Sequence, residues 1–275
     1  MQDPGNGNTD AVASSGSSAR RMPVGFVGHG SPMIALDVAR GAELTAWSKA
    51  LPRRPRAVLV ISAHWEDAPL TLSSISPGTS LVYDFSGFPD ALYAARHDAP
   101  AAPELAQRVM ELAAPWRPRT SARGLDHGAW TVLTHFDPQA SWPTLQVSMP
   151  YTARAEELVA LGRALEPLRD EDVWILGSGN ITHNLRRLDR SGTGELATWA
   201  ADFDAWVEHA LSSGAVDALC APERAPGWAI AHPTPEHYRP LLVALGAAGG
   251  DVATVRFPVV GFDLGSLSRR SVEFG

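Results

Sequence analysis

Two stretches of the chain are apolar at almost every position instead of at alternate positions. They are residues 57–62 (AVLVIS) and 173–176 (VWIL). Alternation is typical of a strand with one solvated face, whereas a continuous apolar run of strand length is typical of a strand covered on both faces. Both stretches therefore predict buried strands of a parallel sheet. Weaker strand patterns occur at residues 24–27, 70–75, 142–149, 253–257 and 270–274.

Segments with apolar residues at helical spacing separate these strands. The clearest is 103–114 (PELAQRVMELAA), which begins with a proline that suits the first turn of a helix. The other segments are 40–50, 153–169, 195–213 and 235–247, the last with a kink expected at Pro240. Strands and helices alternate from end to end without a repeat or a linker. The pattern predicts an α/β fold with one domain, in which helices flank a central, mostly parallel or mixed β-sheet.

Composition narrows the class of protein. Residues 1–21 are rich in Gly, Ser, Asn and Asp and lack the apolar segment of a secretory signal, so we expect a disordered tail there and one folded domain over residues 22–275. A formal net charge of −7 does not suit binding to nucleic acid or to anionic membranes. No run approaches the about 18 apolar residues of a membrane span, and a cytoplasmic location is expected. The single cysteine, Cys220, excludes an intrachain disulfide and a cysteine-based zinc site.

Three of the nine histidines come directly after, or shortly after, predicted strands. His29 follows VGFVG, His64 follows AVLVISA, and His183 follows VWILGSGNIT. In open α/β sheets the carboxyl ends of parallel strands meet at one edge, where binding sites form. Three histidines at three such ends can converge, and neutral imidazole is a ligand for Zn, Cu, Fe and Ni. The sequence therefore predicts a metal site at this edge, although each histidine taken alone suits a hydrogen-bonded loop residue equally well.

Two further segments carry histidines that suit a site. His127 lies in GLDHGAW, a loop that enters a short helix. His237 lies in AHPTPEHY, where Thr234 is a plausible N-cap and Pro235 a plausible first helical residue. The positive end of a helix favours the neutral imidazole that a metal needs, although a first-turn His237 facing solvent is the alternative. His97, His135 and His209 are interpreted as structural or surface residues.

Other catalytic motifs do not occur in the sequence. Neither Ser31 nor Ser178 lies in a G-x-S-x-G elbow, and no dinucleotide or phosphate-binding glycine motif is present. Cys220 has no neighbouring histidine and is interpreted as a packed thiol. Residues 83–89 (YDFSGFP) form an aromatic loop, which suits either the wall of a pocket for a flat ring or a packed satellite of the core.

The motifs together resemble the DOPA 4,5-dioxygenase type of class III extradiol ring-cleaving dioxygenases, over nearly all of residues 22–275. One motif alone is weak, but six in the same order are specific. They are Gly28-His29-Gly30-Ser31-Pro32-Met33, Ser62-Ala63-His64-Trp65, Asp84-Phe85-Ser86-Gly87-Phe88-Pro89, Asp126-His127-Gly128, Ser178-Gly179-Asn180 with His183-Asn184-Leu185, and Pro233-Thr234-Pro235-Glu236-His237-Tyr238; Gly265-Ser266-Leu267-Ser268 also fits.

The resemblance implies a non-haem metal site that uses O₂ to cleave a catechol ring beside its hydroxyls and gives a ring-opened semialdehyde. It places His29, His64 and His237 at metal-ligand positions. His183 matches a position that is an acid/base in related enzymes and a metal-site residue in this branch, so it stays a candidate for both roles. His127 is implied to hydrogen-bond to oxygen or substrate. Fe(II) is expected for activity, and Zn(II) as a metal bound on purification, because three histidines without the usual carboxylate also resemble a zinc site.

Two other functions remain compatible with the residues. One is a zinc-dependent hydrolase with Glu236 as base, and the other is a non-catalytic metal-binding interaction protein on the same scaffold. The sequence identifies neither the catechol, nor the ring position cleaved, nor the oligomeric state. A substrate with a carboxylate would need a cationic partner, for which the candidates are Arg186, Arg187 and Arg239.

Overall fold

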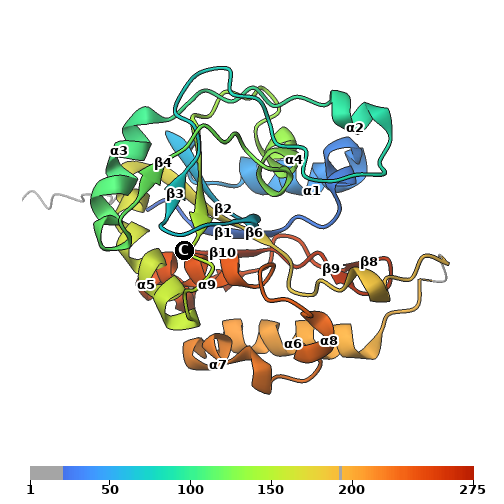
Figure 1. Ribbon diagram of the computed structural model, residues 1–275. Helices are drawn as coiled ribbons and strands as arrows, with labels where there is room; N and C mark the ends of the chain where they lie inside the picture. Colours follow the sequence, from blue (N-terminus) through green and yellow to red (C-terminus); the bar gives the residue numbers. More distant parts are fainter. Residues whose placement is uncertain (1–20, 192–193) are drawn as a thin grey trace, which may run out of the picture.

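The computed structural model describes residues 21–191 and 194–275 (Figure 1). An eight-stranded mixed sheet, in the order β4-β3-β5-β2-β6-β1-β10-β7, runs through its centre, and a hairpin of β8 and β9 stands apart from it. The strands are β1 (Val24–Gly28), β2 (Ala57–Glu66), β3 (Thr71–Leu72), β4 (Arg119–Thr120), β5 (Thr144–Met149), β6 (Val173–Gly179), β7 (Val255–Arg256), β8 (Phe262–Asp263), β9 (Leu267–Ser268) and β10 (Val272–Phe274).

The four middle strands β5, β2, β6 and β1 are mutually parallel, and β10 pairs antiparallel with β1 on one side and with the edge strand β7 on the other. The predicted α/β fold and its central mixed sheet are confirmed. Of the expected tail, residues 1–20 lie outside the described residues, whereas Arg21 is described and pairs with Glu166 and Asp170.

Helices cover both faces of the sheet (Figure 1). In the part of the chain that the structure describes, no helix is both long and apolar enough to cross a membrane. The helices are α1 (Val38–Lys49), α2 (Asp90–Ala94), α3 (Pro103–Leu112), α4 (His127–Phe136), α5 (Ala155–Leu165), α6 (Thr198–Ser212), α7 (Val216–Cys220), α8 (Trp228–Ala231) and α9 (Arg239–Ala248).

Strand β2 shows why the continuous apolar run is needed. Leu59 and Ile61 belong to the apolar core that α3, α5, α6 and α9 close on one face of the sheet. Val58 and Val60 belong to the separate core that α1 and α4 close on the other face. Since successive side chains of a strand point to opposite faces, only a strand with two covered faces requires apolar residues at every position.

Several expected elements are shorter than predicted, such as the strand expected at 70–75, of which only Thr71–Leu72 is a strand, and two helices differ in ways that bear on the site. The helix predicted over 153–169 ends at Leu165 and continues as a 3-10 helix over Glu166–Glu171. The helix predicted over 235–247 begins only at Arg239, so the predictions of Thr234 as N-cap and Pro235 as first helical residue are wrong. Pro240 falls in the first turn, where its missing N–H has no partner to lose, and the kink expected there does not occur.

Helices α5 and α9 approach each other through paired glycines. A Cβ on Gly246 would collide with the carbonyl oxygen of Val159, and a Cβ on Gly162 with the carbonyl oxygen of Val243. Gly246→Ala should therefore lower the free energy of unfolding by about 1–3 kcal/mol, the usual cost of overpacking, as measured by urea denaturation. Gly250→Ala is the control, because a Cβ there meets no atom within 4 Å. An unchanged midpoint for Gly246→Ala would contradict the close approach of the two helices.

Candidate metal centre and substrate cavity

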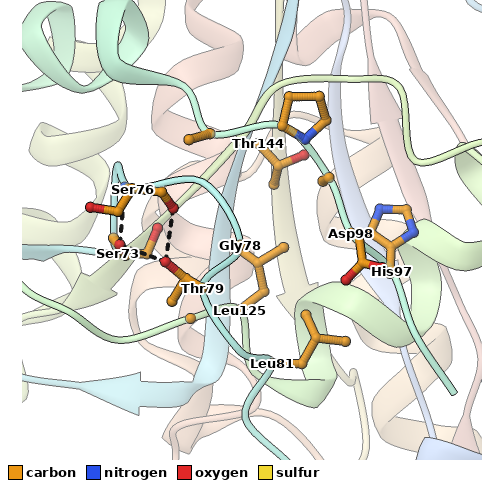
Figure 2. Close-up of a pocket in the computed structure, with 14 residues that line it drawn as sticks. Ser73, Ser76, Gly78, Thr79, Leu81, His97, Asp98, Leu125 and Thr144 are labelled. Carbon is orange, nitrogen blue, oxygen red and sulfur yellow. Dashed lines mark hydrogen bonds between the residues drawn. The ribbon is translucent and has the colours of Figure 1, made fainter. Parts of the chain in front are cut away.

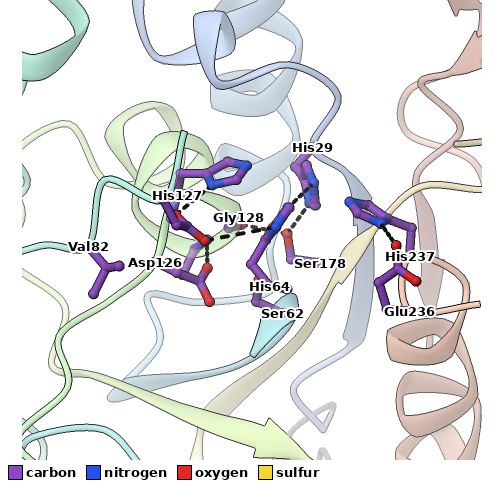
Figure 3. Close-up of polar contacts among 12 residues, drawn as sticks. His29, Ser62, His64, Val82, Asp126, His127, Gly128, Ser178, Glu236 and His237 are labelled. Carbon is purple, nitrogen blue, oxygen red and sulfur yellow. Dashed lines mark hydrogen bonds and ion pairs between the residues drawn. The ribbon is translucent and has the colours of Figure 1, made fainter. Parts of the chain in front are cut away.

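Five histidines converge at the carboxyl edge of the parallel strands, and Figure 3 labels four of them, His29, His64, His127 and His237. His29 directly follows β1, and His183 lies in the loop after β6. His64 lies within β2 near its end, not after it as predicted, because the strand extends to Glu66. His127 is the first residue of α4, and His237 lies in the turn before α9. The sequence prediction that these side chains meet is confirmed by the distances between their rings.

Three of the rings lie close together, and two of them bring their Nε2 atoms into contact. The Nε2 atoms of His29 and His64 are 3.1 Å apart. The ring of His237 lies 5.4 Å from that of His29 and 4.8 Å from that of His64, between centroids. The Nε2 atom of His237 is buried and has no hydrogen-bond partner among the described residues. A buried polar atom without a partner is costly, and a metal ion bound there would satisfy it.

In two of these rings, His29 and His237, the Nδ1 atom faces a hydrogen-bond acceptor. Ser178 donates to the carbonyl oxygen of Gly128 at 2.5 Å, so its oxygen accepts from Nδ1 of His29 at 2.9 Å. Nδ1 of His237 lies 3.0 Å from a carboxylate oxygen of Glu236. A proton held on Nδ1 leaves the Nε2 lone pair free, which is the arrangement that metal-binding histidines adopt.

Burial keeps these imidazoles neutral. It lowers the pKa of His29 and of His237 well below the usual range, and each ring also disfavours a charge on its neighbours. The same desolvation lowers the pKa of His64 to about 3. Because a ligand must be unprotonated to bind a metal, the three rings are ready for one at neutral pH.

His183 is oriented differently from the other three rings. It stacks on His237 with ring centroids 3.4 Å apart and planes 9° apart. The lone pair of an imidazole lies in the plane of its ring, so the lone pairs of His183 and His237 lie in two separate, nearly parallel planes. Burial lowers the pKa of His183 to about 4, so this ring is also neutral at pH 7.

His127 is held by a carboxylate that the sequence analysis left without a role. Its Nδ1 lies 2.7 Å from Asp84, whose other oxygen is 3.9 Å from Nδ1 of His64. The side chain of Asp84 is 25% exposed and comes from the aromatic loop 83–89. The quoted motifs contain both Asp84 and Ser178. The sequence does not show which histidine each of them contacts, so neither could be assigned a role from it.

Two groups of side chains have ligand atoms within 4.8 Å of one another. One comprises His29, His64 and His127, and the other comprises His183, Glu236 and His237. The four predicted metal-site residues His29, His64, His183 and His237 are therefore distributed over both groups. The donors available are mainly neutral imidazoles, which suit Fe and Zn rather than Mg or Ca.

A cavity of about 590 Å³ opens beside these histidines. Its volume suits a small organic molecule. Two aromatic rings, Phe85 and Phe88, form part of its wall, so the 83–89 loop is a pocket wall and not only a packed cluster. The rest of its apolar wall comes from Pro32, Leu185, Leu188, Leu264 and Leu267.

The arginines proposed from the sequence as carboxylate partners do not line this cavity. Arg239 is buried and donates to Glu66 and to the carbonyl oxygens of Pro150, Tyr151 and Ala153, so it has a structural role. Arg186 and Arg187 are exposed and lie outside the lining. The arginine that does line the cavity is Arg190, which the sequence analysis missed because no motif contains it.

A second, smaller cavity of about 110 Å³ lies apart from the histidine cluster (Figure 2). It lies beside a loop in which Thr79 donates to the hydroxyl of Ser74 and to the carbonyl oxygen of Ser76. His97 lines it and is buried, with no hydrogen-bond partner for Nε2 among the described residues. His135 binds the carbonyl oxygen of Ile34, and His209 lies on α6. None of the three joins the cluster.

Ser178→Ala should weaken metal binding without removing any ligand. The hydroxyl of Ser178 accepts from His29 and so fixes the tautomer of that ring. Loss of such an outer partner costs about 10- to 100-fold in metal affinity, measured by competition with a chelator. Ser148→Ala is the control, because this buried serine accepts from the backbone of Thr71, away from the cluster. Equal affinities for the two variants would contradict the role of Ser178.

The metal-free protein should lose stability as the pH falls below 6.5. Burial lowers the pKa values of six histidines, so the folded state binds fewer protons than the unfolded state from pH 6.5 down to about 4. The stabilisation is complete above pH 6.5 and is lost progressively below it. The urea midpoint should fall between pH 7 and pH 5, a range above the ordinary carboxylate pKa values. A constant midpoint would contradict this account. The six histidines whose pKa is lowered by burial are His29, His64, His97, His183, His232 and His237.

Comparisons with known proteins agree with this geometry. Residues 36–268 match the family described as the catalytic LigB subunit of aromatic ring-opening dioxygenase. A protein of Escherichia coli K12 named 4,5-DOPA dioxygenase extradiol is 40% identical over 94% of this chain and 96% of its own length. A protein of the same name from Beta vulgaris is 41% identical over 82% of this chain and 86% of its own.

A solved structure supports the same assignment. The crystal structure of an uncharacterised protein from Escherichia coli K12 is 34% identical and superposes with a TM-score of 0.80, covering 93% of this chain and all of that one. The family match spans most of the described residues and includes four of the five clustered histidines. The chain therefore belongs to the family of the catalytic LigB subunit of aromatic ring-opening dioxygenases and is an extradiol, non-haem metal-dependent enzyme of that family.

Proposed function

We propose that His29, His64 and His237 hold Fe(II) and that the enzyme inserts both atoms of O₂ into a catechol to give a ring-opened semialdehyde. The observation that carries the proposal is the contact between the Nε2 atoms of His29 and His64, with the ring of His237 beside both and its buried Nε2 atom without a partner among the described residues. When bound, Fe(II) would supply redox chemistry and open positions at which catechol and O₂ can meet.

The remaining two histidines have separate roles in this proposal. His183, in the cavity and stacked beside His237, takes a proton from a catechol hydroxyl and later returns it as the ring opens. A neutral imidazole is suited to accept that proton. His127, which Asp84 holds through Nδ1, presents its other nitrogen for a hydrogen bond to substrate or oxygen. Phe85 and Phe88 exclude water and orient the flat ring.

Oxygen uptake on catechols tests this proposal. The protein is loaded anaerobically with Fe(II) or with Zn(II), and O₂ consumption is followed on a panel that starts with DOPA, since the named relatives carry that substrate in their names. We expect uptake with Fe(II) only, together with a new visible absorbance from the semialdehyde. No uptake by the Fe(II) protein with any catechol would overturn the proposal. Hydrolysis by the Zn(II) protein would instead support the hydrolase alternative.

A further inference from the structure

The charged groups of the cavity are distributed unevenly. Its histidine region contains Asp84, which is held by His127. Apart from that acid, the described lining contains one further group that is charged at neutral pH, the guanidinium of Arg190. Most of the remaining surface is carbon, so an ion that enters the cavity meets little other polar surface.

Arg190 is placed by the segment that follows the 3-10 helix Leu185–Arg187. The same segment contributes Leu185 and Leu188 to the cavity wall, and Arg190 lines the cavity together with them. The carboxylate of the neighbouring Asp189 accepts hydrogen bonds from the backbone N–H groups of Ser191 and Gly194. Within the described residues, no hydrogen bond or ion pair of Arg190 is formed.

The chemistry of a guanidinium indicates which group it would bind. Arginine presents a planar fork of donors that matches a carboxylate, and Arg190, although exposed, adds this fork to a lining that is otherwise mostly apolar. A catechol that enters hydroxyls first, toward the histidines, leaves its ring substituent among the leucines and Arg190. An ammonium group on that substituent would find no carboxylate on the described lining except Asp84, which His127 already occupies.

We propose that Arg190 is a specificity-determining residue that binds an anionic substituent of the substrate, and that the enzyme selects catechols by a carboxylate on the side chain and not by an ammonium. This inference rests on the proposed catechol cleavage. It assigns the recognition of the side chain to a residue outside the quoted motifs.

Three matched substrates separate the two charges. DOPA carries both a carboxylate and an ammonium, 3,4-dihydroxyphenylpropionate carries only the carboxylate, and the primary amide of the latter carries neither. We expect similar kcat/KM for the first two and a value about 10-fold or more lower for the amide, the size of a charge-assisted hydrogen bond. The preference should shrink as salt is added, because the pair is partly exposed.

Variants at two arginines attribute the preference to one residue. Arg190→Gln should raise KM for the two carboxylates about 10-fold while kcat and the turnover of the amide stay unchanged, as expected when uniform binding is lost. Arg190→Lys should restore part of the preference. Arg186→Gln is the control, since Arg186 is exposed on the same segment but does not line the cavity.

The two proposals fail in different ways. If the amide is cleaved as well as the carboxylates, or if Arg190→Gln keeps the preference, the role of Arg190 is wrong while catechol cleavage stands. If DOPA is cleaved but its des-amino analogue is not, the ammonium is the selected charge and the inference is overturned. If no catechol is cleaved by the Fe(II) protein, the proposed function itself fails.

Discussion

His237→Ala should abolish metal binding and ring opening together. The Nε2 atom of His237 is buried, lacks a partner among the described residues and lies in a ring close to those of His29 and His64. Removal of an outer partner of a metal ligand already costs about 10- to 100-fold in affinity, so the loss of a ligand should cost more. Chelator competition measures the affinity, and oxygen uptake at saturating Fe(II) measures the activity.

His97→Ala is a matched control for this variant. Like His237, His97 is buried and has an Nε2 atom without a partner among the described residues, but it lines the smaller cavity. Both variants remove one buried imidazole, so both can change stability. We expect only His237→Ala to lose metal. If it keeps the affinity of the unaltered protein, the three-histidine site is wrong.

His183→Ala should separate metal binding from catalysis. The ring of His183 is parallel to that of His237, so the lone pairs of the two rings lie in different planes. The variant should therefore keep most of its metal but lose ring opening by about 10²- to 10⁴-fold, the range for a lost general acid or base. Metal content after Fe(II) loading and the rate of oxygen uptake with DOPA measure the two effects.

His183→Gln is a second variant that preserves approximate size and polarity but removes the basic imidazole nitrogen. Because its amide has no basic nitrogen, it should behave like His183→Ala in activity, and it should bind metal at least as well. If either variant loses metal to the degree expected for His237→Ala, His183 is a ligand and the assignment of the acid/base role must be given up. The sequence left both roles open, and the stacked geometry is the reason for choosing one.

The order of elements was predictable because the apolar pattern of a doubly covered sheet is continuous. Val58 and Leu59 need different cores on opposite faces, and that requirement is visible in the sequence. The limits of α9 were not predictable, because both Pro235 and Pro240 suit the first turn of a helix. The structure begins the helix at Arg239, so His237 lies in a turn.

The convergence of histidines was predictable for a similar reason. Parallel strands place their carboxyl ends at one edge, and His29, His64 and His183 lie near three of those ends. The contacts that orient the rings were not predictable. The bonds from Ser178 to His29 and from Asp84 to His127 join residues far apart in sequence. Arg190 was missed because lining a cavity depends on how the loop after β6 folds back over the site.

The fate of the two atoms of O₂ tests the central claim most directly. The Fe(II) protein is given a catechol under ¹⁸O₂, and the ring-opened product is analysed by mass spectrometry before its aldehyde exchanges with water. A dioxygenase reaction at this site predicts that both labelled atoms appear in one product molecule. A product that carries one labelled atom or none, formed at the same rate, would contradict the account.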